Sequence, residues 1–163
     1  MLMIAVVSFT ILALAAFCLT DKRLHLFEIL AVWFTVTAVN VPIYSFFLVN
    51  RHWISVPDSK EKALIRIVYA VILIPLFLTW ATDKMQALRG FGLKMASYLA
   101  IFVLILAGGW TLHKWGVVQV TPTGMWLYVP FKSLILVAAL TSLKFIRFLM
   151  RKDGISHGPI PRN

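Results

Sequence analysis

The sequence predicts an all-α integral membrane protein, a bundle of five transmembrane helices. Of its 163 residues, 61% are hydrophobic and 13% are charged, whereas a soluble domain is about half apolar and a quarter charged. The charged residues are also clustered, which leaves long uncharged runs, and a run of about 18 or more residues is typical of a membrane-spanning helix. These runs do not alternate polar and apolar residues as the strands of a membrane barrel would.

The predicted spans follow one another with short connections. They cover about residues 2–20, 26–49, 64–82, 95–112 and 125–148. The third is the weakest, because it reaches spanning length only if Ala63 to Arg66 forms its first turn and Arg66 extends toward the headgroups. Without it, four spans remain. The connection before the fifth span contains "VVQV", which could form a short extended or interfacial piece.

The chain is predicted to hold one domain and a tail. Residues 1–149 form the transmembrane domain, and we expect residues 150–163 to be a basic, disordered tail, because this segment is short and rich in Gly and Pro. The single cysteine, Cys18, cannot form an internal disulfide or a CxxC pair. No Lys or Arg precedes the first apolar run, as a signal peptide would require, so we expect residues 1–20 to remain as a span.

The basic residues predict the orientation of the chain in the membrane. Sixteen Lys and Arg stand against six Asp and Glu. They flank apolar runs, so we expect anionic lipids rather than nucleic acid to balance them. Ten of the sixteen lie on the side of the bundle that contains the tail, and six lie on the other. Because Lys and Arg concentrate on the cytoplasmic side, we expect the N-terminus outside and the C-terminus in the cytoplasm.

The order of these features is similar to that of a known group of proteins. The second span has a central Asn in "TAVNVPIYSFF", the third has a central Pro in "VILIPLFL", and a Trp-bearing loop and a basic tail follow. Over most of the chain, this layout resembles the uncharacterised small five-helix membrane proteins that are common in spore-forming Firmicutes. The resemblance implies a five-helix fold in a bacterial cytoplasmic membrane, and it implies no activity.

Lys132, in "GMWLYVPFKSLIL", is a basic residue inside the fifth predicted span, away from its ends. If Trp126 and Tyr128 lie at the outer interface, Lys132 lies ~9 Å deeper. Its side chain could bend back to the headgroups, near the Trp126 carbonyl that Pro130 leaves without a donor. Alternatively it faces the bundle, where ionisable groups mark binding sites or ion paths. No acid lies at that depth, so its partner would be a carbonyl, Asn40, water or an anionic ligand.

The segment "VNVPIY" places polar groups near the centre of the second span. Asn40 and Tyr44 share a helix face, and Pro42 leaves the carbonyl of Ala38 without its usual donor, so a kink is expected. Asn40 could make an interhelical hydrogen bond, or line a small polar cavity with Tyr44. Pro75 would kink the third span at a similar depth, which would allow a central crevice between the two spans.

Four residues at span ends are candidate ligands or acid–base groups. His52 and His113 end spans two and four on the same predicted side, and paired histidines can ligate haem or a metal ion. No acid or thiol accompanies them in the membrane, so we expect no metal or other cofactor. His25 and Glu28, at the start of span two, are predicted to be a local capping pair rather than an acid–base dyad.

The acidic residues and the known motifs argue against catalysis. All the acids lie at span ends or in loops, namely Asp21, Glu28, Asp58, Glu61, Asp83 and Asp153. Neither HExxH, nor GxSxG, nor a phosphate-binding glycine loop occurs, so we expect no enzyme. The lack of buried carboxylates also argues against a proton-coupled transporter. Small residues in the last two spans, among them Ala96, Ala100, Gly108 and Gly109, are predicted to serve internal packing, with a homo-oligomer as the alternative.

The sequence therefore predicts a non-enzymatic accessory or scaffold protein that associates with other membrane proteins. The alternative is a small channel, carrier or anionic-lipid-binding protein. It would use a central crevice near Asn40, Pro42 and Lys132, with Tyr44 as a further binding residue.

Overall fold

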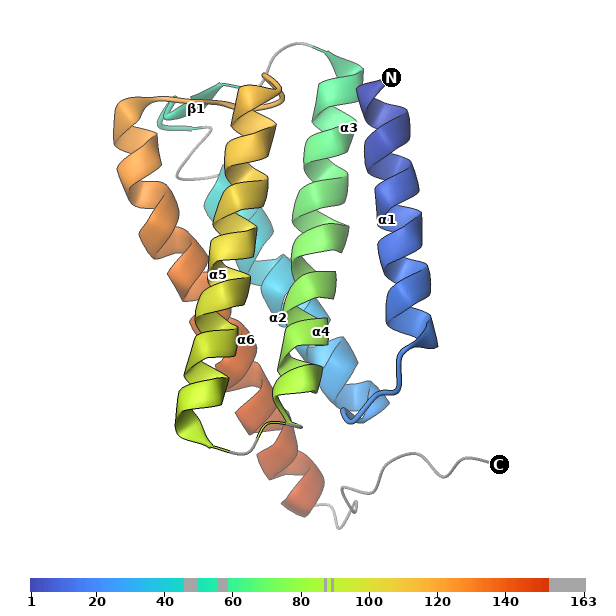
Figure 1. Cartoon of the computed structure of the whole chain (residues 1–163). Coiled ribbons are helices and arrows are strands. Elements are labelled where there is room, and N and C mark those ends of the chain that lie inside the picture. Colours follow the sequence, from blue (N-terminus) through green and yellow to red (C-terminus); the bar gives the residue numbers. More distant parts are fainter. Residues whose placement is uncertain (46–49, 56–58, 87, 89, 153–163) are drawn as a thin grey trace.

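The computed structural model describes residues 1–45, 50–55, 59–86, 88 and 90–152. Within these residues, five helices are long and apolar enough to cross a membrane, and they run side by side in alternating directions (Figure 1). They are α1 (Leu2–Leu19), α2 (Leu26–Ile43), the continuous helix formed by α3 (Lys60–Val68), the π-helical turn η2 (Tyr69–Leu73) and α4 (Ile74–Met85), then α5 (Phe91–Lys114) and α6 (Pro122–Lys152). The five-helix prediction is confirmed at this level, and the third helix is long enough to span.

Several helix boundaries differ from the predicted spans, and α5 (Phe91–Lys114) extends beyond residues 95–112 at both ends. The third helix begins at Lys60, directly after Ser59, so its charged first turn is helical as well. The last helix begins at Pro122, where a proline at the first helical position leaves no unsatisfied N–H, and it extends to Lys152, into the predicted tail. The α-helical part of the second span ends at Ile43. Residues 46–49 of that span and residues 153–163 of the tail lie outside the described residues.

A short antiparallel ribbon closes one end of the bundle. It consists of β1 (Ile54–Ser55) and β2 (Gln119–Val120), so the extended piece in "VVQV" is confirmed. The amide and the hydroxyl of Thr121 both donate to the carbonyl oxygen of Trp53, at 2.9 and 3.1 Å. These contacts join the loop after α2 to the loop before α6 at the end where the N-terminus lies (Figure 1).

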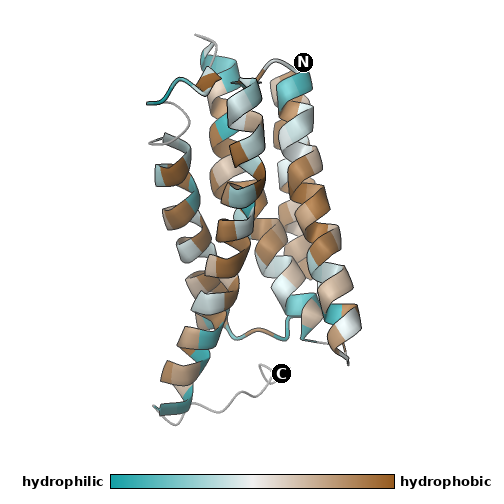
Figure 2. Cartoon of the chain, turned by 90° about the vertical axis from the view of Figure 1, so that its left-hand side faces the viewer, coloured by the Kyte–Doolittle hydropathy of each residue, from teal (hydrophilic) through white to brown (hydrophobic). Residues whose placement is uncertain are grey.

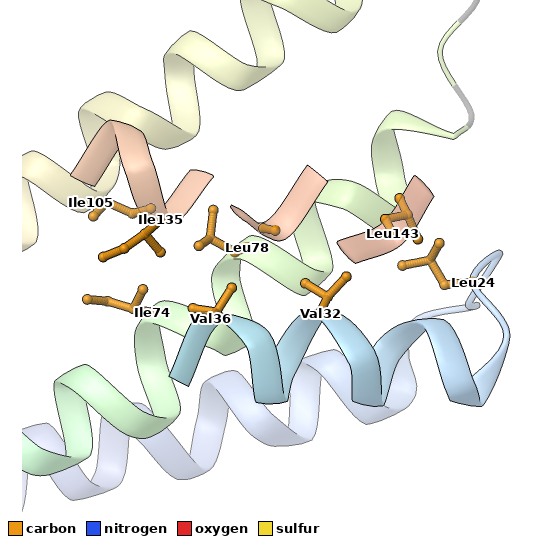
Figure 3. Packing of buried hydrophobic residues seen from close by; sticks show 9 residues of the cluster. Leu24, Val32, Val36, Ile74, Leu78, Ile105, Ile135 and Leu143 are labelled. Atoms are coloured by element: carbon orange, nitrogen blue, oxygen red, sulfur yellow. The ribbon is translucent and has the colours of Figure 1, made fainter. Parts of the chain in front are cut away.

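The core lies between α2, α4 and α6. α2 packs most extensively against α6 and then against α4, and its buried face presents Val32 and Val36, both without exposed surface. Figure 3 shows these valines facing Leu78 of α4 and Ile135 of α6. Apolar residues occupy the middle of the helices, and hydrophilic residues gather toward their ends (Figure 2).

The outer helices are less enclosed by the rest of the chain. In the apolar window of α5, 6% of the residues are buried, compared with 39% for the helix Lys60–Met85. Lipid tails are as apolar as leucine, so burial of apolar surface does not hold membrane helices together as it does in water. Close packing and interhelical hydrogen bonds therefore decide how these helices assemble, and both occur around Lys132.

Candidate functional site

Lys132 lies inside the bundle and joins α6 to α2. Its side chain is 6% exposed, and its ammonium Nζ donates to Oδ1 of Asn40 at 3.1 Å. The Nδ2 group of Asn40 donates in turn to the carbonyl oxygen of Ala70 in η2, at 3.0 Å. The interpretation that Lys132 bends back toward the headgroups is wrong, and the predicted interhelical hydrogen bond of Asn40 is confirmed. One amide thus connects three helices.

The carbonyl of Ala70 needs this side-chain donor because of Pro75. In a regular α-helix the amide of Ile74 would donate to Ala70, but in the π-helical turn it donates to Tyr69 instead. The next amide along the chain would belong to Pro75, which has no N–H. Asn40 supplies the missing donor. Where the sequence predicted a kink near Pro75, the structure has this π-helical turn directly before it.

A small cavity lies beside Lys132, beneath the ribbon formed by β1 and β2. Its volume is about 20 Å³, counted as the space open to the centre of a water molecule. The polar side chains around it come from α2, α3, η2 and α6, and they are Asn40, Tyr44, Arg66, Tyr69, Tyr128 and Lys132. The predicted polar cavity at Asn40 and Tyr44 is therefore present. It is enclosed by more helices than the two that the sequence suggested, and neither Pro42 nor Pro75 lines it.

The aromatic rings of the cavity face its two cations. The Nζ of Lys132 lies 5.1 Å from the ring centroid of Tyr128, and the guanidinium carbon of Arg66 lies 5.2 Å from that of Tyr44. Cations are attracted to the faces of such rings. Among the described residues that line the cavity, none is an Asp or a Glu. The hydroxyl of Tyr44 is buried beside the guanidinium of Arg66, and it forms no hydrogen bond of regular geometry within the described part of the chain.

Two glycines of α5 make room for the tyrosines of the cavity. A Cβ atom on Gly109 would overlap the hydroxyl of Tyr128, and one on Gly108 would lie 2.8 Å from the hydroxyl oxygen of Tyr69. The Tyr69 hydroxyl donates to the carbonyl of Ile105 at 2.9 Å, which fixes η2 against α5. For this pair of small residues, the prediction of internal packing is confirmed.

A second polar cluster lies at the opposite end of the bundle. His25 caps α2: its Nδ1 accepts from the amide of Phe27 at 3.4 Å, and Oε2 of Glu28 accepts from the amide of His25 at 2.7 Å. The predicted capping pair is confirmed. The sequence did not reveal that Oε1 of Glu28 also accepts from Nε of Arg147, at 2.5 Å, or that Arg147 donates to Gln86 at 3.0 Å.

Asp83 connects the end of α4 to the turn between α1 and α2. It has no exposed surface, and its Oδ1 accepts from the amides of Arg23 and Leu24 at 2.6 and 2.9 Å. Glu28 is only 2% exposed. The expectation that the chain has no buried carboxylates is therefore wrong for these two, although both lie near helix ends. Their partners are backbone amides and one arginine, so both serve to fix the helices.

The two candidate histidines have different surroundings. His52 is exposed, with a positive φ of 56°, in the turn before β1. The Nδ1 of His113 lies 3.1 Å from the carbonyl oxygen of Val118 and accepts from the amide of Val120 at 3.4 Å, so it fixes the loop that leads into β2. Across the described ranges, no group of three or more His, Cys, Asp or Glu is placed to hold a metal ion.

The site that the structure brings together is thus the cavity of Lys132, Asn40 and Tyr44, extended by Arg66, Tyr69 and Tyr128. The residues that the sequence prediction did not include, Arg66, Tyr69 and Tyr128, lie on α3, η2 and α6. The adjacent glycines of α5 are a sequence signal for the two tyrosines, because they leave room for them. Comparison with protein-family models, with curated proteins and with solved structures finds no match.

Proposed function

We propose that this protein is a non-enzymatic accessory subunit of a bacterial cell membrane that holds a transmembrane helix of a partner protein against α4 and α5. A groove of about 400 Å³ runs between these helices, at the end away from the ribbon. We call it the α4–α5 groove. Three of its ten described lining residues are small, Ala81 of α4 and Ser97 and Ala100 of α5, and the others are larger, among them Phe77 and Trp80.

The small residues favour a helix over a lipid chain as the occupant of this groove. A lipid tail is flexible and can fill space beside a side chain of any size. A helix needs small residues if its backbone is to approach closely, and close approach is a main source of helix association in membranes. The small side chains occur on both walls of the groove, which is the arrangement that a third helix would contact.

The weak enclosure of α5 supports the same proposal. Its apolar window is 6% buried within the chain, and outward side chains such as Leu99 and Val103 are 63% and 55% exposed. Its end near Gly108 and Gly109 is packed against the tyrosines of the cavity. Toward its other end, Ser97 and Ala100 line the α4–α5 groove, where a partner helix could contact them.

The orientation that we propose places the N-terminus outside and the groove in the cytoplasmic half. The turn between α1 and α2, the end of α4 and the end of α6 lie at the same end of the bundle (Figure 1), and these segments contain Lys22, Arg23, Lys84 and Arg147. Basic residues concentrate on the cytoplasmic side. Lys84 also lines the groove. It is suited to meet either the anionic lipids of that leaflet or an acidic residue of the partner.

Native mass spectrometry of the protein, extracted from its own membrane in a mild detergent, tests the accessory role. We expect a stoichiometric protein partner with the wild type. Ala100→Trp should remove this partner by filling the groove. The matched control is Val137→Trp on α6, since Val137 is 57% exposed and does not line the groove, and this variant should keep the partner.

Three results would contradict the proposal. The wild type could be alone, both variants could keep the partner, or both could lose it. If the wild type instead forms a homo-oligomer, and Ala100→Trp dissociates it, the occupant of the groove is a second copy of this chain rather than a different protein.

A further inference from the structure

We propose that the cavity beside Lys132 binds one small monovalent anion of about the size of chloride. This site lies beneath the ribbon, whereas the α4–α5 groove lies at the other end of the bundle. The inference is therefore independent of the accessory role, and each can fail without the other.

The polar groups around the cavity offer more hydrogen-bond donors than acceptors. The ammonium of Lys132 has three donors, and the hydrogen bond to Asn40 uses one of them. The buried hydroxyl of Tyr44 makes no hydrogen bond of regular geometry in the described residues, and the guanidinium of Arg66 lies beside the same tyrosine. A water molecule would have to donate as well as accept here, whereas an anion accepts from every side.

The charge of the cavity also favours an anion. Buried charges in proteins are paired, because an isolated one is costly to remove from water. Lys132 is buried and Arg66 is partly buried; both line the cavity, and no carboxylate does so among the described residues. Glu61, one turn and a half before Arg66 on the same helix, instead accepts a hydrogen bond from the amide of Met3 at 3.1 Å. An anion would supply the missing counter-charge.

The size of the cavity selects the class of anion. A space of about 20 Å³ for the centre of a water molecule holds about one water-sized particle. That suits a monatomic ion, whereas a phosphate or a lipid headgroup would need the cavity to widen. On the ribbon side, three apolar side chains cover the space: Ile54, Val118 and Val120. These side chains exclude a large polar ligand and leave the site suited to an ion that sheds its water.

Equilibrium dialysis of the purified full-length protein against radiolabelled chloride tests the inference. Gluconate, which is too large for the cavity, replaces chloride at constant ionic strength. We expect about one bound chloride per chain, with bromide competing for it. A melting temperature that is higher in chloride than in gluconate should accompany binding, because a ligand that binds only the folded state stabilises it.

Two substitutions locate the bound ion. Lys132→Met should abolish chloride binding, and Lys144→Met, an exposed lysine on the same helix, should leave it unchanged. Tyr44→Phe removes only one hydroxyl, and it should raise the Kd by about tenfold, since a hydrogen bond to a charged group is lost. Its matched control is Tyr98→Phe on α5. Because Tyr44→Phe removes no packing, it keeps the inference testable if Lys132→Met fails to fold.

The inference is overturned if the wild type binds no chloride and its melting temperature is the same in chloride and gluconate. It is overturned as well if chloride binding survives both Tyr44→Phe and Lys132→Met. A phospholipid retained at one per chain and lost in Lys132→Met would assign the site to a lipid headgroup instead. Loss of the protein partner in Ala100→Trp, with chloride binding intact, would leave both proposals standing.

Discussion

Replacing Asn40 by leucine removes the side chain that connects α2, η2 and α6. The amide accepts from Lys132 at 3.1 Å and donates to the carbonyl of Ala70 at 3.0 Å, and it is 2% exposed. Leucine has the same branched arrangement of four heavy atoms in its side chain, so the substitution leaves no cavity, and its methyl groups are somewhat larger than the amide atoms. It therefore isolates the loss of two interhelical hydrogen bonds.

The expected loss of stability is about 2–4 kcal/mol. A buried polar group that loses its partner costs about 1–3 kcal/mol, and two groups are affected, the ammonium of Lys132 and the carbonyl of Ala70. Two such groups would together cost about 2–6 kcal/mol. Because hydrogen bonds between membrane helices average only about 0.6 kcal/mol, we expect a value in the lower half of that range. The carbonyl has no main-chain donor in reserve, because Pro75 has no N–H.

The assay is the free energy of unfolding of the purified protein, measured by reversible denaturation with SDS in mixed micelles. Thr37→Val on the same helix is the control: its hydroxyl is buried without a partner among the described residues, so its removal should change the free energy by less than about 0.5 kcal/mol. In the Lys132→Met background, Asn40→Leu should cost about half as much, because only the carbonyl of Ala70 then loses a partner. Equal costs for Asn40→Leu and Thr37→Val would refute the reasoning.

Two further substitutions test the contacts at each end of the bundle by the same unfolding measurement. Arg147→Met should cost about 3 kcal/mol, since it leaves the carboxylate of Glu28 buried without its ion-pair partner. Its control is Arg151→Met, at the exposed end of the same helix, which should cost almost nothing. Similar values for both would show that the ion pair does not stabilise the fold. Gly109→Ala should destabilise the protein by about 1–3 kcal/mol, because its Cβ would overlap a tyrosine hydroxyl. Gly92→Ala, on the same helix, meets open space and should be neutral or stabilising. The reverse order would contradict the described packing.

The helices could be predicted from the sequence because their cause is local. An uncharged run in lipid must satisfy its own backbone groups, and a helix does so without outside partners. The third helix shows where this reasoning works less well. Its charged beginning, from Lys60, is as helical as its apolar part, so hydropathy alone underestimates its length. The capping of α2 by His25 and Glu28 is also local, and it was predicted correctly.

The direction in which Lys132 points could not be decided from the sequence. An almost uniformly apolar helix has no polar face to show which side meets the bundle. The structure shows that Lys132 shares its face with Ile135, Ala139 and Leu143, all buried, but in the sequence the other faces of α6 are equally apolar. The burial of Asp83 was missed for a related reason, since position near a helix end does not reveal which side chains pack over it.

The partners of Asn40 and Tyr44 depend on contacts that are distant in the chain. Asn40 meets Ala70, 30 residues away, and Lys132, 92 residues away. Each requires a particular rotation of a neighbouring helix, and Ala70 is available only because of the π-helical turn next to Pro75. The sequence indicated a polar cavity near these residues, and the three-dimensional packing determined which residues enclose it.

Photo-crosslinking in the native membrane tests the accessory role most directly. A photoreactive amino acid would replace Ala100 in the α4–α5 groove, and in a second variant it would replace Val137 on the outward face of α6, which is 57% exposed. We expect a single crosslinked partner protein from position 100 and none of defined size from position 137. The same products from both positions, or none from position 100, would contradict the assignment of the groove to a partner helix.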